Sequence, residues 1–465
     1  MSEQQLEQIA SDLVGRAVRA GATAADVVVR ETDQFSTSLR LGKIESLKEA
    51  ASKSLGLRVF LGARSASAYS SDFSAPSLER LVERTISMAK VTSEDPASGL
   101  PDPELLGRHT GDLALYSDDV GKLSTEERIA YARRAEDAAL AADPRIKNSE
   151  GASFEATLAA KAYANSLGFV GSYRGSYCGF SVVPIAQDGA PKGEQPGSES
   201  GTAGAGMQRD YWYSVARRVS ALEDPESVGR KAAERALRRL GARKVPTCRC
   251  PIIFDSQTAP SIVGHIFDAV RGDAIYRSAS FLAGKLGQRV AGENVTVLDD
   301  GLRPGGFGSR PFDDEGVPAG VTPVIEKGVL SSYLLNCYTA RKLNLRTTGN
   351  ATRGVAGPPG VGPKNFYLPA GTHTPEEMIK SVDRGLYVTE LIGFGVNVVT
   401  GDYSRGAAGM WIEKGALAYP VEEVTIAGNL REIINHIAMI GTDLEFKSVI
   451  AAPTLLVEGL TVAGI

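Results

Sequence analysis

The chain has 465 residues, with 51 Lys and Arg against 55 Asp and Glu, which gives a formal net charge of −4. This weakly acidic balance gives no electrostatic reason to expect nucleic acid or an anionic membrane as the main partner. Hydrophobic residues make up 43% and charged residues 23%, as is typical of a globular protein that buries its own cores.

The N-terminal sequence lacks the segments of a secretory signal, and no apolar run approaches the roughly 18 residues of a membrane span. The four cysteines, Cys178, Cys248, Cys250 and Cys337, are too few for a disulfide scaffold of this length. Cys248 and Cys250 are expected on one face of a strand. We therefore expect a cytoplasmic protein with reduced thiols and no membrane partner.

The N-terminal stretch predicts a helix, then strands, then a second helix. Apolar residues at helical spacing predict an amphipathic helix over 6–17. Alternating apolar residues predict half-buried strands over 27–41 and 55–61. A second amphipathic helix is expected over 76–89. This order is typical of an α+β unit with an antiparallel sheet.

The next stretch begins with residues 92–120, which are rich in Pro, Asp, Ser and Gly and are expected to form a surface connection. Ser124 and Glu127 have the spacing of a capping box, in which each side chain binds the other residue's backbone N–H. The helix that they open is expected to end before Asp143. Alternation over 153–186 predicts the strands of a second antiparallel sheet.

A region dense in Gly, Ser, Pro and Ala, residues 188–206, is expected to be a flexible loop. A basic helix is predicted over 225–241, and its charged side chains are expected to form a solvated face. The residues that make it basic are Arg230, Lys231, Arg235, Arg238 and Arg239. Without stacking aromatics or a recognised motif, this face does not indicate nucleic-acid binding.

The sequence changes character after Val245-Pro246, where glycines and short β-type runs become dense. These runs are 250–255, 295–298, 329–335, 385–399, 410–424 and 455–463. Helices are expected near 258–270 and 429–440. We therefore predict an α+β protein of two domains, an N-terminal α+β domain over 1–245 and a β-rich C-terminal domain over 246–465.

The sequence contains no complete catalytic constellation. Its four histidines, His109, His265, His373 and His436, do not form the His-Glu-x-x-His pattern that places two imidazoles and a general base around zinc. A phosphate loop and a Gly-x-Ser-x-Gly elbow are also absent, and the glycine clusters do not match a dinucleotide fingerprint. We therefore assign no catalytic residue from the sequence.

The segment Tyr387–Gly409 combines strand-like runs with glycine-bearing turns, and polar side chains crowd its second turn. Such a segment could hold an extended peptide by strand addition. It could equally form a tight hairpin whose polar side chains cap their own turn. The residues alone favour neither alternative.

Several long runs resemble a known family. They are 311–318 (Pro-Phe-Asp-Asp-Glu-Gly-Val-Pro), 328–330, 333–335, 338–343, 348–351, 385–391, 401–409 (Gly-Asp-Tyr-Ser-Arg-Gly-Ala-Ala-Gly) and 419–430. On these runs the sequence is similar to the TldD/PmbA family of metallopeptidases, and specifically to its PmbA (TldE) branch. The similarity is dense from about residue 250 to residue 465 and looser before that.

The resemblance implies a division of labour between two branches. The TldD branch carries a His-Glu-x-x-x-His zinc helix and a later cysteine ligand, whereas the PmbA branch pairs with it and lacks this set. Alignment on Gly272-Asp273 places the three motif positions on Val263, Gly264 and Asp268, which cannot make that zinc site. No cysteine follows Cys337. We therefore expect no metal or other cofactor on this chain, and zinc in the partner subunit.

The resemblance also implies the same two-domain fold and a function. It implies a zinc-free, non-catalytic subunit of a TldD/TldE-type heterodimeric metalloprotease, which cleaves unfolded or extended peptides in proteolysis and peptide maturation. The partner would be a TldD-type zinc peptidase subunit, and the isolated chain could form a homodimer. The candidates for a peptide channel or subunit interface are Glu390, Asp402, Tyr403, Ser404 and Arg405.

Two alternatives come from other classes of protein. The first is a homodimeric peptidase or hydrolase with an unrecognised site, which would use Asp268, Glu390, Asp402, Tyr403 or Arg405. The second is a scaffold that binds peptides without cleaving them. Cleavage by the chain alone would favour the first alternative, and binding without partner-dependent turnover would favour the second.

Overall fold

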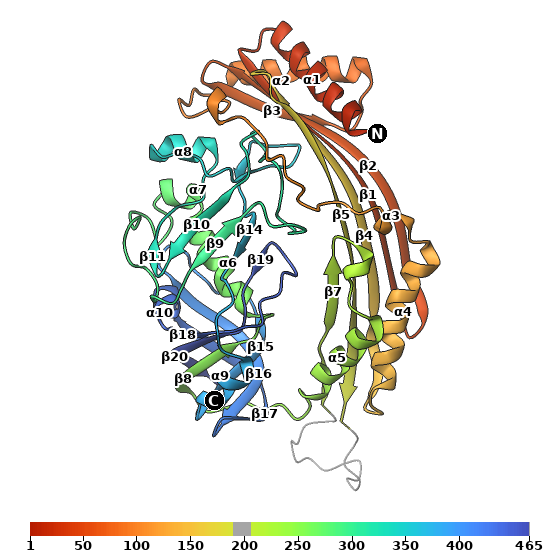
Figure 1. The fold of residues 1–465 in the computed structure, drawn as a ribbon, viewed down its shortest axis with the longest axis vertical. Helices are drawn as coiled ribbons and strands as arrows, with labels where there is room; N and C mark the ends of the chain where they lie inside the picture. Colours follow the sequence, from red (N-terminus) through yellow and green to blue (C-terminus); the bar gives the residue numbers. More distant parts are fainter. Residues whose placement is uncertain (189–205, 465) are drawn as a thin grey trace.

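The structure, a computed structural model, describes residues 1–188 and 206–464. The predicted loop 188–206 therefore lies outside the described residues, apart from its two ends. Figure 1 shows a long curved sheet from the N-terminal half of the chain, which arches over and faces a more compact C-terminal part. This arrangement of helices and mostly antiparallel strands confirms the predicted α+β class.

The described strands before residue 217 form one seven-stranded sheet, ordered β3-β2-β1-β4-β5-β6 with β7 beside β5. They are β1 (Ala24–Arg40), β2 (Lys43–Leu61), β3 (Arg64–Ser70), β4 (Ile146–Asn165), β5 (Val170–Gln187), β6 (Met207–Arg209) and β7 (Trp212–Ala216). β1 and β4 pair directly, from Asp26 opposite Asn165 to Leu39 opposite Ala152. The prediction of two separate sheets is therefore wrong, because alternation shows which face of a strand is buried but not which strand lies beside it.

Helices cover one face of this sheet (Figure 1). They are α1 (Glu3–Arg19), α2 (Ala75–Val91), α3 (Asp119–Lys122), α4 (Thr125–Ala141) and α5 (Pro225–Leu237), with 3₁₀ turns at Pro103–Leu105 and Val219–Ala221. Val27 and Val29 share a core with α1 and α2, and Phe35 shares one with α4 and α5. The predicted capping box is confirmed, since the Oγ of Ser124 accepts the N–H of Glu127 at 3.1 Å.

The other face of the sheet points towards the C-terminal part. Because side chains alternate along a strand, Asp26 points away from the helices that cover Val27. The Oδ2 of Asp26 accepts a hydrogen bond from Arg58 Nε at 3.0 Å, and its Oδ1 accepts one from Arg353 Nη1 at 2.8 Å. Asp26 is fully buried, and each arginine is 6% exposed. This ion network joins β1 and β2 to a segment more than halfway along the chain.

The acidic run of the motif at 311–318 is buried at the same junction. Asp314 forms ion pairs with Lys161 of β4 and Arg30 of β1. Asp313 accepts three backbone N–H bonds at 2.9 to 3.0 Å. Burial raises the pKa of both Asp313 and Glu315. This motif therefore joins the two parts of the chain.

The basic helix α5 differs from its prediction at its C-terminal end. Arg230 remains largely exposed, but Arg235 is only 9% exposed. The Nε of Arg235 donates to Asp210 at 3.1 Å, and its Nη1 lies 3.6 Å from Asp255 of the C-terminal part. The prediction of a wholly solvated face is wrong, because this end of the helix meets buried carboxylates from distant segments.

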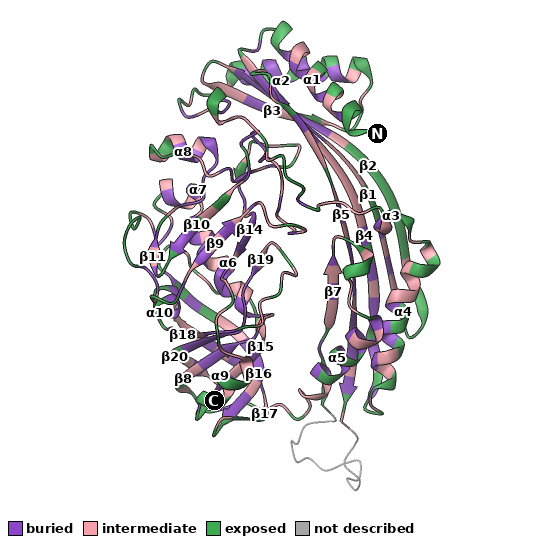
Figure 2. Ribbon diagram, viewed as in Figure 1, coloured by how far each residue is buried: buried purple, intermediate pink, exposed green. Residues whose placement is uncertain are grey.

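The C-terminal part contains a six-stranded sheet, β17-β16-β15-β8-β20-β18, a five-stranded sheet, β11-β10-β9-β14-β19, and a small pair, β12-β13. The strands are β8 (Cys248–Phe254), β9 (Val297–Asp300), β10 (Val321–Glu326), β11 (Val329–Leu330), β12 (Ala351–Thr352), β13 (Gly360–Val361), β14 (Asn365–Tyr367), β15 (Arg384–Ile392), β16 (Asp402–Glu413), β17 (Ala416–Asn429), β18 (Ile437–Ile440), β19 (Ile450–Ala451) and β20 (Leu455–Ala463). Buried side chains from both larger sheets form one core, and a smaller cluster includes Ile253, Ile412 and Leu456 of the six-stranded sheet. Figure 2 shows many residues of these strands as buried.

The helices of this part are short. They are α6 (Ala259–Val270), α7 (Gly272–Tyr276), α8 (Cys337–Leu343), α9 (Pro375–Ser381) and α10 (Leu430–Asn435). The structure contains the helix predicted over 258–270, whereas the one predicted over 429–440 ends early and continues as β18. The predicted strand 410–424 is divided between β16 and β17 by a turn at Lys414-Gly415, where both residues have positive φ. Within the described residues, no helix has the length and apolar character that a membrane crossing requires.

Candidate functional site

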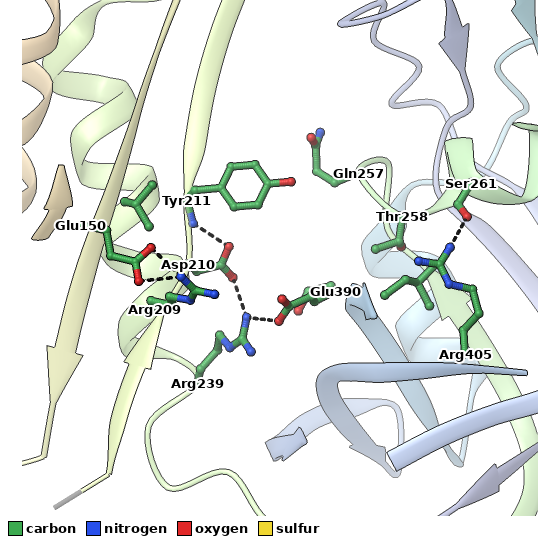
Figure 3. A pocket seen from close by; sticks show the side chains of 13 residues that line it. Glu150, Arg209, Asp210, Tyr211, Arg239, Gln257, Thr258, Ser261, Glu390 and Arg405 are labelled. Atoms are coloured by element: carbon green, nitrogen blue, oxygen red, sulfur yellow. Dashed lines mark hydrogen bonds and ion pairs between the residues drawn. The ribbon is translucent and has the colours of Figure 1, made fainter. Parts of the chain in front are cut away.

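A cavity of about 490 Å³ lies where the N-terminal sheet meets the C-terminal part (Figure 3). Its lining comes from β4, β5, the β6–β7 connection, the chain after α5, the start of α6, and strands β15 and β16. The lining residues are Glu150, Val183, Arg209, Asp210, Tyr211, Arg239, Gln257, Thr258, Ser261, Thr389, Glu390, Leu391 and Arg405. The volume falls within the range of roughly 300–1,000 Å³ that is usual for ligand pockets.

An irregularity in β15 shapes one wall of this cavity. The pairing of β15 with β16 passes from Val388–Gly409 to Glu390–Ala408, so Thr389 is an extra residue in the strand. Such a β-bulge turns the neighbouring side chains relative to a regular strand. A Cβ at Gly409 would lie 1.9 Å from a carbonyl oxygen of β15, so the close approach of the two strands here requires glycine. The bulge lies where Glu390 enters the cavity lining.

Two of the three arginines that line the cavity are paired with carboxylates. Arg209 Nη1 donates to both oxygens of Glu150 at 2.5 Å. Arg239 Nη1 lies 2.6 Å from Glu390 Oε2 and 3.7 Å from Asp210 Oδ2. These pairs connect β4 to β6 and the chain after α5 to β15, so they hold the walls of the cavity together.

Arg405, the third arginine, has a different environment. Its Nη1 donates to the Oγ of Ser261 at 2.8 Å, and Figure 3 shows its guanidinium directed into the cavity. Its buried Nε has no hydrogen-bond partner among the described residues, and the same holds for His265 Nε2 and the Tyr403 hydroxyl. Burial and the charge of Arg405 lower the pKa of His265 to about 4, so this imidazole is neutral at neutral pH.

The five residues predicted for a channel or interface do not all meet at this site. Glu390 and Arg405 line the cavity. Tyr403 is 1% exposed and belongs to the core. Asp402 and Ser404 point to the opposite face of β16 and are exposed, because side chains alternate along the strand.

The segment Tyr387–Gly409 forms a hairpin from β15 and β16. The Thr400 hydroxyl donates to Asp402 Oδ2 at 2.6 Å, and Asn397 Oδ1 accepts the N–H of Val399 at 2.9 Å, so polar side chains cap the loop. β15 lies between β8 and β16, and β16 lies between β15 and β17. Of the two alternatives for this segment, strand addition or a hairpin that caps its own turn, the structure contains the hairpin.

Most of the lining was not predicted from the sequence. Glu150, the neighbours Arg209 and Tyr211, and Ser261 come from three segments far apart in the chain, and no local spacing relates these segments. The one available signal is the basic stretch predicted as a helix over 225–241, whose residue Arg239 lies in the chain after α5. It was interpreted as a solvated face because the carboxylates that meet it lie in other segments.

The degenerate zinc positions lie on α6. Val263 is fully buried in the core, and Gly264 has no side chain to offer. Asp268 is the single potential ligand of the three. Burial raises its pKa, and its Oδ1 lies 3.8 Å from Arg271. No group of three or more His, Cys, Asp or Glu side chains in the described part of the chain could hold a metal ion. These residues do not fit zinc.

The fold and the cavity define a class of protein: an α+β chain in which a long antiparallel sheet and a β-rich part enclose a polar cavity. Sequence profiles of PmbA/TldA metallopeptidases match this chain in three stretches, domain 1 over 25–89, the central domain over 118–240 and the C-terminal domain over 247–464. A metalloprotease PmbA from Escherichia coli O157:H7 is 37% identical over 95% of this chain and 92% of its own length. A metalloprotease PmbA homologue from Haemophilus influenzae is 34% identical over 99% of this chain and 97% of its own length.

Solved structures agree with this. A candidate modulator of DNA gyrase from Bacteroides thetaiotaomicron superposes with a TM-score of 0.88 at 26% identity, covering 98% of both chains. TldE from Thermococcus kodakarensis has the same fold, with a TM-score of 0.84 at 19% identity over 98% of this chain and 99% of its own. The chain therefore belongs to the PmbA/TldD metallopeptidase family, and within it to the PmbA/TldE branch.

Proposed function

We propose that this chain is the zinc-free subunit of a heterodimeric metalloprotease, in which a TldD-type partner holds the zinc and cleaves extended peptides. The observation that carries this proposal is the state of α6. Val263 is buried, Gly264 has no side chain, and Asp268 has no companion ligands in the described part of the chain, which otherwise retains the family fold. Loss of the ligands together with retention of the fold suits a subunit whose task is structural or substrate-binding.

The cavity supports a role in handling peptides rather than mere support of the partner. It contains polar groups from both parts of the chain, and Arg405 has no carboxylate partner among the described residues. A pocket that combines apolar walls with a few placed polar groups is typical of ligand sites. We also propose a boundary between two domains at residues 245–246 and a cytoplasmic location. The division is supported by separate hydrophobic cores on either side of it.

The proposal is tested by mixing the purified chain with a TldD-type subunit and following cleavage of an unfolded peptide. We expect cleavage by the mixture, none by this chain alone, and stoichiometric zinc only in the partner. Asp268→Asn in this chain should leave cleavage by the mixture within about twofold of its original rate. Replacing the first zinc-binding histidine of the partner by alanine should abolish it. Zinc-dependent cleavage by this chain alone would contradict the proposal.

A site of its own is less well supported. Of the residues considered for an independent hydrolase, Glu390 and Arg405 line the cavity, whereas Asp402 is exposed on the opposite face of β16 and Tyr403 lies in the core. These four residues therefore do not meet at one site.

A further inference from the structure

The arginines around the cavity divide into two kinds. Arg209 and Arg239 each contact a carboxylate of this chain at 2.5 to 2.6 Å. Within the described residues, Arg405 donates a hydrogen bond to the Ser261 hydroxyl and has no carboxylate within 4.0 Å. A guanidinium in a partly enclosed site usually has an anionic or planar acceptor. Arg405 is therefore the cation of this cavity that is available to a ligand.

We propose that the cavity binds the carboxylate group of a peptide, with Arg405 and Ser261 as its direct contacts. This inference rests on the proposed function in one respect, that the ligand is a peptide. The carboxylate itself is inferred from the cavity. A guanidinium presents paired N–H groups that match two carboxylate oxygens, and a serine hydroxyl can donate to the same group.

The surroundings of Arg405 favour an anion. Ser261 lies in the first turn of the twelve-residue helix α6, where the helix dipole stabilises negative charge. The neighbouring His265 is neutral, so it neither repels Arg405 nor supplies a counter-charge. Three carboxylates also line the cavity, and each forms an ion pair with an arginine other than Arg405. Glu150 pairs with Arg209, Asp210 with Arg235 and Arg239, and Glu390 with Arg239. Of the three lining arginines, Arg405 is thus the one without a carboxylate partner among the described residues.

The remaining walls suit the chain that carries the carboxylate. Tyr211, Val183 and Leu391 line the cavity together with the charged groups, and Tyr211 is 48% exposed. These side chains offer an apolar surface to a residue next to the carboxylate. A volume of about 490 Å³ accommodates the end of a peptide or one acidic side chain, but not a long extended segment. Both sources have the same carboxylate chemistry, and experiment can distinguish them.

The test measures binding of labelled five-residue peptides of alanine and leucine to the full chain by fluorescence anisotropy. One peptide ends in a free carboxylate, the second in an amide, and the third in an amide but with one internal glutamate. We expect the free acid to bind at least tenfold more tightly than the plain amide. If the third peptide binds as tightly as the free acid, the site accepts side-chain carboxylates. If it binds only as tightly as the plain amide, the site selects the peptide terminus. Equal binding of all three peptides, or no binding of any, overturns the inference.

Variants identify the residue responsible. Arg405→Gln should abolish the preference for the acid, and Arg405→Lys should retain part of it because the charge remains. The matched control is Arg230→Gln, which removes an exposed arginine of α5 outside the cavity lining and should keep the preference. Ser261→Ala should reduce it about threefold, and this variant serves if Arg405→Gln does not fold in a thermal melt. Retention of the full preference in both Arg405→Gln and Ser261→Ala overturns the inference.

The outcomes also separate this inference from the proposed function. Cleavage by the mixture of subunits without any preference for acids refutes the carboxylate site and leaves the heterodimer intact. An acid preference in binding, without partner-dependent cleavage, refutes the heterodimer and leaves the carboxylate site intact.

Discussion

Asp26→Asn tests how strongly the two parts of the chain depend on their buried ion network. The carboxylate of Asp26 is fully buried and accepts hydrogen bonds from Arg58 at 3.0 Å and Arg353 at 2.8 Å. Asparagine has nearly the same shape but leaves two buried guanidinium groups without their shared counter-charge. Removing one partner from a buried ion pair costs about 3 to 5 kcal/mol. We therefore expect Asp26→Asn to lower the free energy of unfolding by an amount in that range. The control, Asp33→Asn, changes an exposed residue of β1 and should alter stability by less than about 0.5 kcal/mol.

The pH dependence of stability gives the same variant a second signature. Burial alone would raise the pKa of Asp26, but the charges of Arg353 and Arg58 outweigh it and hold this pKa below its ordinary value of 3.8. The folded state therefore binds the proton less readily than the unfolded state. The stability contributed by the carboxylate is present above pH 3.8 and is lost as pH falls through the lower folded value. Asp26→Asn should lack this component.

The assay uses urea unfolding followed by tryptophan fluorescence. The chain has two tryptophans, Trp212 in β7 and Trp411 in β16, so Trp212→Phe and Trp411→Phe give one reporter for each part. We expect Asp26→Asn to lower stability with both reporters. Adding Arg353→Met should recover part of the loss, because one stranded charge is removed. A loss below about 1 kcal/mol, no larger than that of Asp33→Asn, would refute the reasoning.

Three further predictions concern other parts of the molecule. Gly409→Ala places a Cβ 1.9 Å from a backbone oxygen and should lower the free energy of unfolding, measured in urea, by more than about 2 kcal/mol. The control is Gly354→Ala, whose Cβ would meet nothing within 4 Å and which should change this free energy little. Burial and the charge of Arg405 lower the pKa of His265 from 6.5 to about 4, so between these values the unfolded chain binds the proton more readily than the folded chain. The free energy of unfolding should therefore fall between pH 7 and pH 5. His265→Gln should reduce that fall by about 1 kcal/mol after allowance for partial exposure. In the folded chain a thiol reagent should modify Cys248 first, and a uniform reaction rate would contradict this. The thiols protected until unfolding should be Cys178, Cys250 and Cys337.

Local structure follows from sequence where short-range interactions decide it. The helix after Ser124 was predictable because its capping box involves residues three apart, and the N-terminal helix because its apolar residues recur at helical spacing. The class of fold followed from the order of such elements. The resemblance to the family located the degenerate zinc positions Val263, Gly264 and Asp268 by alignment on Gly272-Asp273, and all three lie on α6.

The cavity could not be predicted in the same way. Its charged residues meet only in the folded chain, where β4, β5 and β6 pair in one sheet and Arg239 reaches Glu390 of β15. Arg239 was interpreted as a solvated charge, since its partners Asp210 and Glu390 lie in other elements. Asp402 and Arg405 are three residues apart but lie on opposite faces of one strand.

By itself, the sequence determined the class of fold and the capped helix after Ser124, because each depends on residues close together in the chain. The tertiary structure alone decided that the acidic motif at 311–318 joins the two parts, and that Arg405 faces a cavity without a carboxylate partner among the described residues. The physical reason is that burial and charge pairing depend on which distant segments meet. That pairing is set by packing of the whole chain, and no local pattern of residues records it.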